Sequence, residues 1–91
     1  MKLYLAHLGF YDEKYGMYEL HTNKHVVAKD LTDAKRKLLS DPEVIQLKMH
    51  VDGLQEINHV DGYDIALNAR DNAKDARNPS FNHSEVKKIP V

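Results

Sequence analysis

Cysteine and tryptophan are both missing from this 91-residue sequence, which also has only four glycines and three prolines. The lack of cysteine excludes disulfide bonds, thiolate metal ligands and cysteine nucleophiles. No apolar stretch approaches the ~18 residues of a membrane-spanning helix. The N-terminal apolar run is also too short, and too soon followed by charges, for a signal peptide. We therefore expect a cytoplasmic protein with no membrane partner.

An excess of charge of either sign is missing too. The sequence has 13 basic and 14 acidic residues, for a net charge of −1. A dedicated nucleic-acid-binding domain usually carries a basic surplus or stripe, so no nucleic-acid partner is expected. The densest basic run, residues 35–37, is better explained as a solvated helix face than as a phosphate contact.

The first part of the chain predicts two strands. Residues 3–8 are apolar on both alternating faces, which suits a central strand or one that is covered on both sides. Residues 17–28 are rich in β-forming side chains. Thr22-Asn23-Lys24 indicates either a hairpin or a bulge within one long strand, and the short flanking arms favour the bulge.

A helix is predicted next. Asp30 is a good N-cap, and Asp33 lies where a capping box would have Glu. Apolar residues that would face a sheet repeat at helical spacing: Leu31, Ala34 and Leu38. Asp41-Pro42 is expected to end this helix, because the residue before proline avoids helical geometry.

From residue 44 onward the pattern predicts a β-meander. Residues 44–51 alternate between apolar and polar side chains, as a half-buried strand does. Asp52-Gly53 indicates a hairpin turn, residues 54–58 would run back, and Asp61-Gly62 would form a second turn. Residues 63–67 would be the last strand.

Together these elements predict a single small α+β domain in the order ββαβββ, with one helix packed on a mostly antiparallel sheet. Residues 1–67 would form the compact domain. Residues 68–91 would be a polar tail, disordered or weakly helical, with an alanine-bearing stretch from Ala69 to Arg77. Val86, Ile89 and Val91 either pack back as an edge segment or belong to a solvated end, and the composition favours the solvated end.

Several segments of the sequence together match a known pattern. They are residues 2–4 with Leu8-Gly9, residues 19–21, residues 26–28, and the stretch 50–63 that ends in Val-Asp-Gly-Tyr. In this order they resemble a bacterial family catalogued as domain of unknown function 1543, over roughly residues 1–67. The resemblance implies a compact α/β domain of bacterial or phage origin with no assigned activity.

The resemblance supplies no catalytic residues. Phe10 departs from it, because family members commonly have a second glycine or a similar small residue there, and this puts the turn after the first strand in doubt. Some relatives carry two copies of the domain, whereas this chain has room for one.

Six histidines are many for this length, and histidine is the commonest metal ligand. The tetrapeptide His-Val-Asp-Gly occurs twice, so His50 and His59 each come with a carboxylate suited to a divalent metal. If both Asp-Gly pairs are successive turns, a five-residue strand at ~3.3 Å per residue separates them by roughly 17 Å. One ion in one chain would not reach both. The repeat therefore predicts two hairpin turns and no metal site.

The other histidines give weaker signals. His21 and His25 are four residues apart, but the chain between them is expected to bend, which disfavours a shared metal. His7 alternates with Leu3 and Leu5, and it is expected to be a hydrogen-bonded core histidine. His83 lies in the tail and suggests no role.

Patterns of catalytic residues are also lacking. The acidic pairs Asp12-Glu13 and Asp61/Asp64 are explained by solvated turns, because a core of this size leaves little room for a catalytic cleft. Ser40 and Ser84 have no local context of an activated nucleophile. The glycines form no phosphate-binding loop. We expect no catalytic residues and no cofactor.

Tyrosine supplies most of the aromatic side chains, and Tyr11 and Tyr15 flank the long first connection near Phe10 and Met17. Tyrosine is enriched at protein contacts, although ordinary strand packing explains these residues as well. The leading hypothesis is a non-catalytic interaction module that self-associates, with a homodimer or another protein as partner; the sequence leans against an enzyme without deciding the question. The alternative is a binder of small molecules or anions that uses residues 10–21. A third hypothesis is an enzyme whose His50 and His59 meet across subunits.

Overall fold

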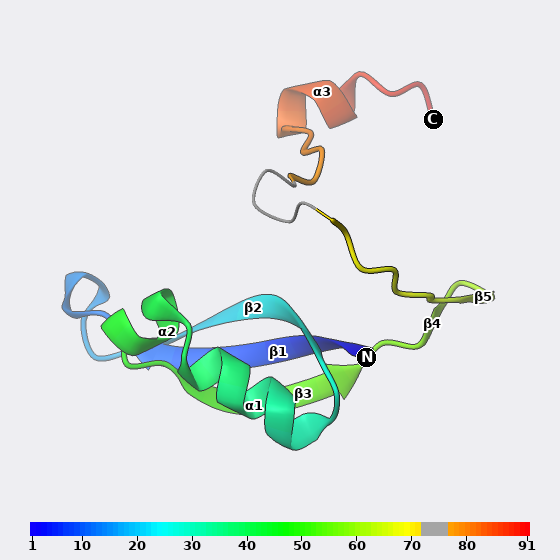
Figure 1. Cartoon of the computed structure of the whole chain (residues 1–91). Coiled ribbons are helices and arrows are strands. Elements are labelled where there is room, and N and C mark those ends of the chain that lie inside the picture. The colour runs from blue at the N-terminus through cyan, green and yellow to red at the C-terminus, as the bar shows by residue number, and fades with distance from the viewer. Residues whose placement is uncertain (72–76) are drawn as a thin grey trace.

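The computed structural model describes residues 1–71 and 77–91, and its centre is a three-stranded antiparallel sheet (Figure 1). The strands lie in the order β2-β1-β3. Their bounds are Lys2–Tyr11 for β1, Glu19–Ala28 for β2 and His50–Glu56 for β3. Two helices, α1 (Leu31–Leu39) and α2 (Pro42–Gln46), pack on one face of this sheet. The predicted α+β class is confirmed, with a second helix that the sequence-based order lacked.

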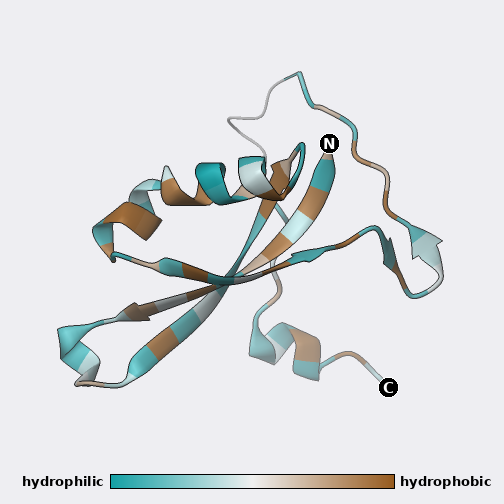
Figure 2. Ribbon diagram, turned by 90° about the horizontal axis from the view of Figure 1, so that it is seen from below, coloured by the Kyte–Doolittle hydropathy of each residue, from teal (hydrophilic) through white to brown (hydrophobic). Residues whose placement is uncertain are grey.

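The alternation of side chains along β1 decides which face of the sheet is the core. Tyr4, Ala6 and Leu8 are buried against the helices, while His7 is exposed on the opposite face. Figure 2 shows the same exchange of hydrophobic and hydrophilic residues along the strands. The predicted central position of the first strand is confirmed, but among the described residues the two packed helices cover only one of its faces.

The second strand is continuous. Its pairing with β1 runs without a shift from Lys2↔Ala28 to Tyr11↔Glu19. The favoured prediction of one long strand is therefore confirmed, but the bulge expected at residues 22–24 is absent, and the hairpin alternative was wrong. A short 3-10 helix, η1 (Glu13–Tyr15), joins β1 to β2, and the side chain of Asp12 begins it by accepting a hydrogen bond from the Lys14 amide at 3.0 Å.

Helix α1 begins as predicted. The Asp30 side chain accepts a hydrogen bond from the Asp33 amide at 2.8 Å, and Asp33 in turn accepts one from the Lys29 amide at 2.9 Å. That bond from Lys29 lowers the pKa of Asp33. Ala34 and Leu38 are buried, but Leu31 is 58% exposed and does not join the core.

The predicted strand over residues 44–51 is wrong, because α2 occupies its first half. Asp41 accepts hydrogen bonds from the amides of Glu43 and Val44 at 2.9 and 3.4 Å, and Pro42 takes the first helical turn. Asp41-Pro42 thus ends α1 and begins α2, because the fixed φ of proline suits the first turn of a helix. The chain leaves α2 through Lys48, whose φ is +51°, and enters β3 after the buried Met49.

The predicted hairpin at Asp52-Gly53 is also wrong. Strand β3 continues through it, and residues 54–56 extend the same strand rather than running back. Leu8 pairs with Val51 and His7 pairs with Gly53, so Asp52 is an extra residue that forms a β-bulge. The long edge of β1 offers backbone partners on both sides of this dipeptide, and pairing along that edge overrides the local turn preference.

The turn predicted at Asp61-Gly62 is confirmed. It joins β4 (His59–Val60) to β5 (Tyr63–Asp64), and both central residues have positive φ, +54° and +84°. This two-residue geometry is the one that favours Asp-Gly. The two short strands form a sheet of their own, so residues 63–67 do not extend the main sheet as predicted.

Helix α3 (His83–Lys87) lies in the C-terminal segment, and Asn82 caps it by accepting a hydrogen bond from the Glu85 amide at 2.9 Å. The helix predicted from Ala69 to Arg77 falls largely on residues 72–76, which lie outside the described residues. None of the helices in the described ranges is long and apolar enough to cross a membrane.

Candidate functional site

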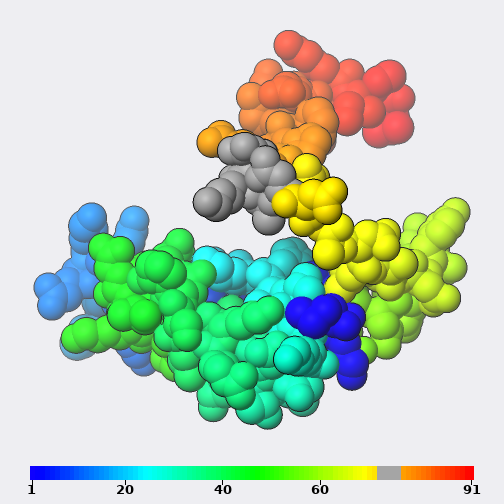
Figure 3. Space-filling view, in the orientation of Figure 1, coloured from blue at the N-terminus to red at the C-terminus, as the bar shows by residue number. Residues whose placement is uncertain are grey.

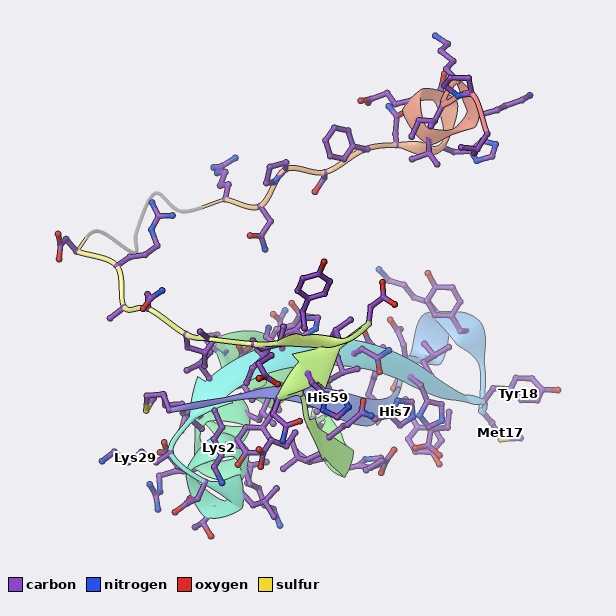
Figure 4. All side chains as sticks on the ribbon, turned by 90° about the vertical axis from the view of Figure 1, so that its right-hand side faces the viewer. Lys2, His7, Met17, Tyr18, Lys29 and His59 are labelled. Atoms are coloured by element: carbon purple, nitrogen blue, oxygen red, sulfur yellow. The ribbon has the colours of Figure 1, made fainter. Side chains whose placement is uncertain are left out.

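The face of the sheet that lies opposite α1 and α2 carries a group of titratable side chains that contact one another. We call it the open face, because no helix in residues 1–71 or 77–91 packs on it. Residues that pair across β1, β2 and β3 lie on the same face as one another, and successive pairs alternate between the core face and the open face. His7 lies on the open face, and Figure 4 shows its position among the strand side chains.

Four titratable side chains gather at one point of the open face: Glu19 and His21 from β2, and His50 and Asp52 from β3. The Nε2 atom of His50 lies 2.9 Å from Glu19 Oε1 and 3.2 Å from Asp52 Oδ1. His21 closes the group, with Nδ1 3.6 Å from Asp52 Oδ2 and Nε2 3.9 Å from Glu19 Oε1. We call these four residues the imidazole–carboxylate cluster.

Strand pairing explains how residues so far apart in the sequence meet. Gly9 of the central strand pairs with His21 on one side and with His50 on the other. Glu19 is two residues before His21 and shares its face, and the bulge places Asp52 beside His50. The cluster therefore sits directly over Gly9.

Gly9 leaves the space that the cluster fills. A Cβ atom on Gly9 would lie 2.5 Å from Asp52 Oδ2 and 2.7 Å from His50 Nε2, and closer still to Glu19 Oε1. Gly9 is itself buried, although it faces the side of the sheet that no packed helix covers. A glycine in a strand interior often marks such a close approach.

His7 supports the cluster from the side. Its ring stacks on that of His21, with centroids 4.7 Å apart and planes inclined by 8°. His7 Nδ1 lies 3.1 Å from Asn23 Oδ1, within hydrogen-bonding distance. His7 is exposed. The expectation that it is a core histidine was therefore wrong.

The cluster has the donor atoms of a metal site. Single ligand atoms of Glu19, His50 and Asp52 lie within 4.8 Å of one another, and those of His7, His21 and Asp52 do the same. His59 belongs to neither group; it stands in β4 with its Nδ1 2.8 Å from Asn58 Oδ1. His50 lies in a strand rather than beside a hairpin turn, and its partners in the cluster are the carboxylates of Glu19 and Asp52.

A second feature lies just beyond the C-terminal end of β1. A hollow of about 470 Å³ is lined by Tyr11, Asp12, Glu13, Lys14 and residues 46–48. The aromatic residues of this region are exposed, Tyr11 by 62% and Tyr15 by 64%. Met17 and Tyr18, exposed by 93% and 80%, project from the tip of the β1–β2 connection in Figure 4.

The comparison with protein families agrees with the resemblance noted in the sequence. A family model described as Domain of Unknown Function (DUF1543) matches residues 16–67, more than half of the chain. The chain belongs to the DUF1543 family. No curated protein and no solved structure matches it.

All four residues of the cluster lie inside the DUF1543 match, whereas His7 and Gly9 precede it. The family description names no activity. The sequence pointed to His50 and Asp52, which stand two residues apart, but spacing could not show that Glu19 and His21 of another strand join them. Gly9 was a second local signal, a glycine within a largely apolar strand.

Proposed function

We propose that this DUF1543 chain is a non-catalytic, self-associating interaction module whose C-terminal segment, residues 77–91, docks on a second copy. A cytoplasmic location belongs to the same proposal. The observation that carries it is the exposure of large apolar side chains on this segment. Phe81 is 70% exposed, Val86 51% and Ile89 56%.

The segment stands apart from the body of its own chain. In Figure 3 residues 77–91 form a lobe of their own, separate from the sheet and its helices. The radius of gyration is 16.1 Å, compared with about 12 Å for a compact chain of this length. Apolar side chains presented in this way gain free energy when they are buried, at about 25 cal/mol per Å².

The body offers a surface of matching chemistry. A mainly apolar hollow of about 430 Å³ is lined by Met1, Val27 and residues 67–70. Its volume is within the range of about 300–1,000 Å³ over which proteins commonly bury ligand groups. Because one chain carries both the apolar segment and the apolar hollow, a two-fold dimer can exchange segments reciprocally.

Sedimentation velocity of the full chain at micromolar concentration tests the proposal. We expect a dimer, twice the 10.5 kDa monomer. The double variant Phe81→Asp, Ile89→Asp removes two apolar anchors, each worth about 1.5–3 kcal/mol, and should weaken the dimer at least about 100-fold. Tyr18→Asp is the matched control, an exposed aromatic outside the segment, and should leave the dimer intact. A wild-type chain that sediments as a monomer would contradict the proposal.

The hollow beside residues 11–14 favours a second candidate function, the binding of a small molecule. Lys14 and Lys48 offer positive charge there, but Asp12 and Glu13 offset it. His21 does not help an anion, because it lies beside Glu19 and Asp52. A thermal-shift screen of metabolites on wild type and Lys48→Ala tests this candidate, since a ligand at this hollow raises the midpoint of wild type only. No shift with any metabolite would count against it.

A further inference from the structure

We propose that the imidazole–carboxylate cluster binds one divalent transition-metal ion, of the zinc class, with Glu19, His50 and Asp52 as ligands and the fourth position of the ion open to solvent. This inference is independent of self-association, because no residue of the cluster lies in the segment 77–91 or in the apolar hollow. It rests on four observations: the donor distances, the charges, the room above Gly9 and the support from His7.

The donor spacing matches a tetrahedral ion. Ligand atoms at about 2.0–2.2 Å from such an ion lie roughly 3.3–3.6 Å apart. His50 Nε2 lies 2.9 Å from Glu19 Oε1 and 3.2 Å from Asp52 Oδ1, and single ligand atoms of all three residues lie within 4.8 Å of one another. Small side-chain rotations therefore suffice to place these three donors around one centre. One imidazole nitrogen with two carboxylate oxygens suits zinc and its neighbours, whereas magnesium and calcium prefer oxygen alone.

The charges of the cluster favour a cation. Glu19 and Asp52 both approach His50, and across the described residues the ion-pair partners of both carboxylates are histidines, with no lysine or arginine among them. Imidazole binds metals in its neutral form. A divalent ion would thus neutralise two negative charges that the protein otherwise holds close together.

The room above Gly9 is specific to these donors. The three side chains that a Cβ would meet there are the three proposed ligands, Glu19, His50 and Asp52. Gly53, the other glycine of the sheet, has only His7 Cβ nearby at 3.9 Å, an ordinary contact. The convergence is therefore a local property of the Gly9 position.

His21 and His7 act as positioning residues. His21 Nδ1 lies 3.6 Å from Asp52 Oδ2 and orients that ligand, while the stacking of His7 fixes the plane of the His21 ring and the contact of His7 with Asn23 orients the stack. Groups that orient metal ligands in this way typically change the metal affinity by about 10–100-fold when they are removed.

The test uses the full chain after treatment with a chelator, titrated with Zn²⁺ or Co²⁺ alone. Isothermal calorimetry should give one equivalent, and Co²⁺ should show the visible absorption of a tetrahedral complex. Asp52→Asn and His50→Gln should each weaken binding at least about 100-fold. His59→Gln is the matched control, since it alters the same tetrapeptide outside the cluster, and should bind as wild type does.

Gly9→Ala tests the geometry without removing a ligand. We expect a loss of affinity of at least about tenfold, while Gly53→Ala should bind normally. Circular dichroism checks that each variant remains folded, and the ligand variants keep the proposal testable if Gly9→Ala does not fold. Absence of stoichiometric binding by the wild type would overturn the proposal. An equal loss in His50→Gln and His59→Gln would do the same, because it would place the ion elsewhere.

Discussion

The two copies of His-Val-Asp-Gly have identical sequences and different structures. The first copy, residues 50–53, lies in β3, pairs with the central strand and contributes a bulge. The second copy, residues 59–62, begins in β4 and ends in a two-residue turn with positive φ at Asp61 and Gly62. One copy gives His50 and Asp52 to the cluster, and the other gives it nothing.

Pairing partners, rather than local preference alone, therefore decide the structure of an Asp-Gly dipeptide in this chain. Beside the first copy runs the ten-residue strand β1, whose edge supplies partners before and after Asp52. The second copy has passed the end of that strand and pairs only with the residues that follow it. Where no long partner is present, the intrinsic turn tendency of Asp-Gly prevails.

The largest expected difference in stability between variants of the two copies comes from their valines. Val51 packs against the core, whereas Val60 is 52% exposed. Val51→Asp places an unpaired charge against apolar side chains and should lower the free energy of unfolding by about 2–4 kcal/mol. Val60→Asp should change it by less than about 0.5 kcal/mol. Urea unfolding followed by circular dichroism measures both, and similar losses would contradict the assignment of the two environments.

Much of the first half of the fold could be predicted from the sequence, because local signals and tertiary contacts agree there. The Asp30 cap and the buried positions Ala34 and Leu38 follow from helical spacing, and the observed contacts match them. The prediction failed around Asp41-Pro42, because Asp-Pro both ends one helix and begins the next. The alternation of residues 44–51 alone is consistent with a strand, but the cap at Asp41 begins a helix there.

The cluster could not be predicted, for a different reason. Glu19 and His50 are 31 residues apart and meet only because β1 lies between their strands. The residue pattern of one strand does not reveal which side chains of the neighbouring strands lie beside it. Gly9 indicated a close approach of other groups, since a glycine in a strand interior often marks such a site.

A smaller effect, with opposite signs in the two copies, is expected from their glycines. Gly62 has φ +84°, so Gly62→Ala should destabilise the hairpin by about 1–2 kcal/mol. Gly53 does not have positive φ, and Ala fits there, so Gly53→Ala should stabilise the domain by about 0.4–1 kcal/mol. Hydrogen exchange of the Ile65 amide, which donates to Asn58 O at 2.9 Å, reports on the hairpin. The urea midpoint reports on the sheet, and a loss of stability in Gly53→Ala would show that the bulge needs its glycine.

The smallest effect concerns the helix that leads into the first copy. The Lys24 ammonium lies 3.0 Å from Asp41 Oδ2 and lowers the pKa of Asp41, with help from the Val44 and Glu43 amides. A carboxyl whose pKa is lower in the folded state stabilises that state above its unfolded pKa, near 3.8, and loses this contribution as the pH falls through the folded value. The free energy of unfolding of wild type, measured in urea, should therefore fall below about pH 4. Asp41→Asn should make this free energy depend less on pH. The second copy follows no such cap, so hydrogen exchange of Ile65 should respond less to Asp41→Asn than the amides of β3 do. An equal response would mean that the hairpin and the sheet unfold as one unit, and that the two copies differ in structure but not in stability.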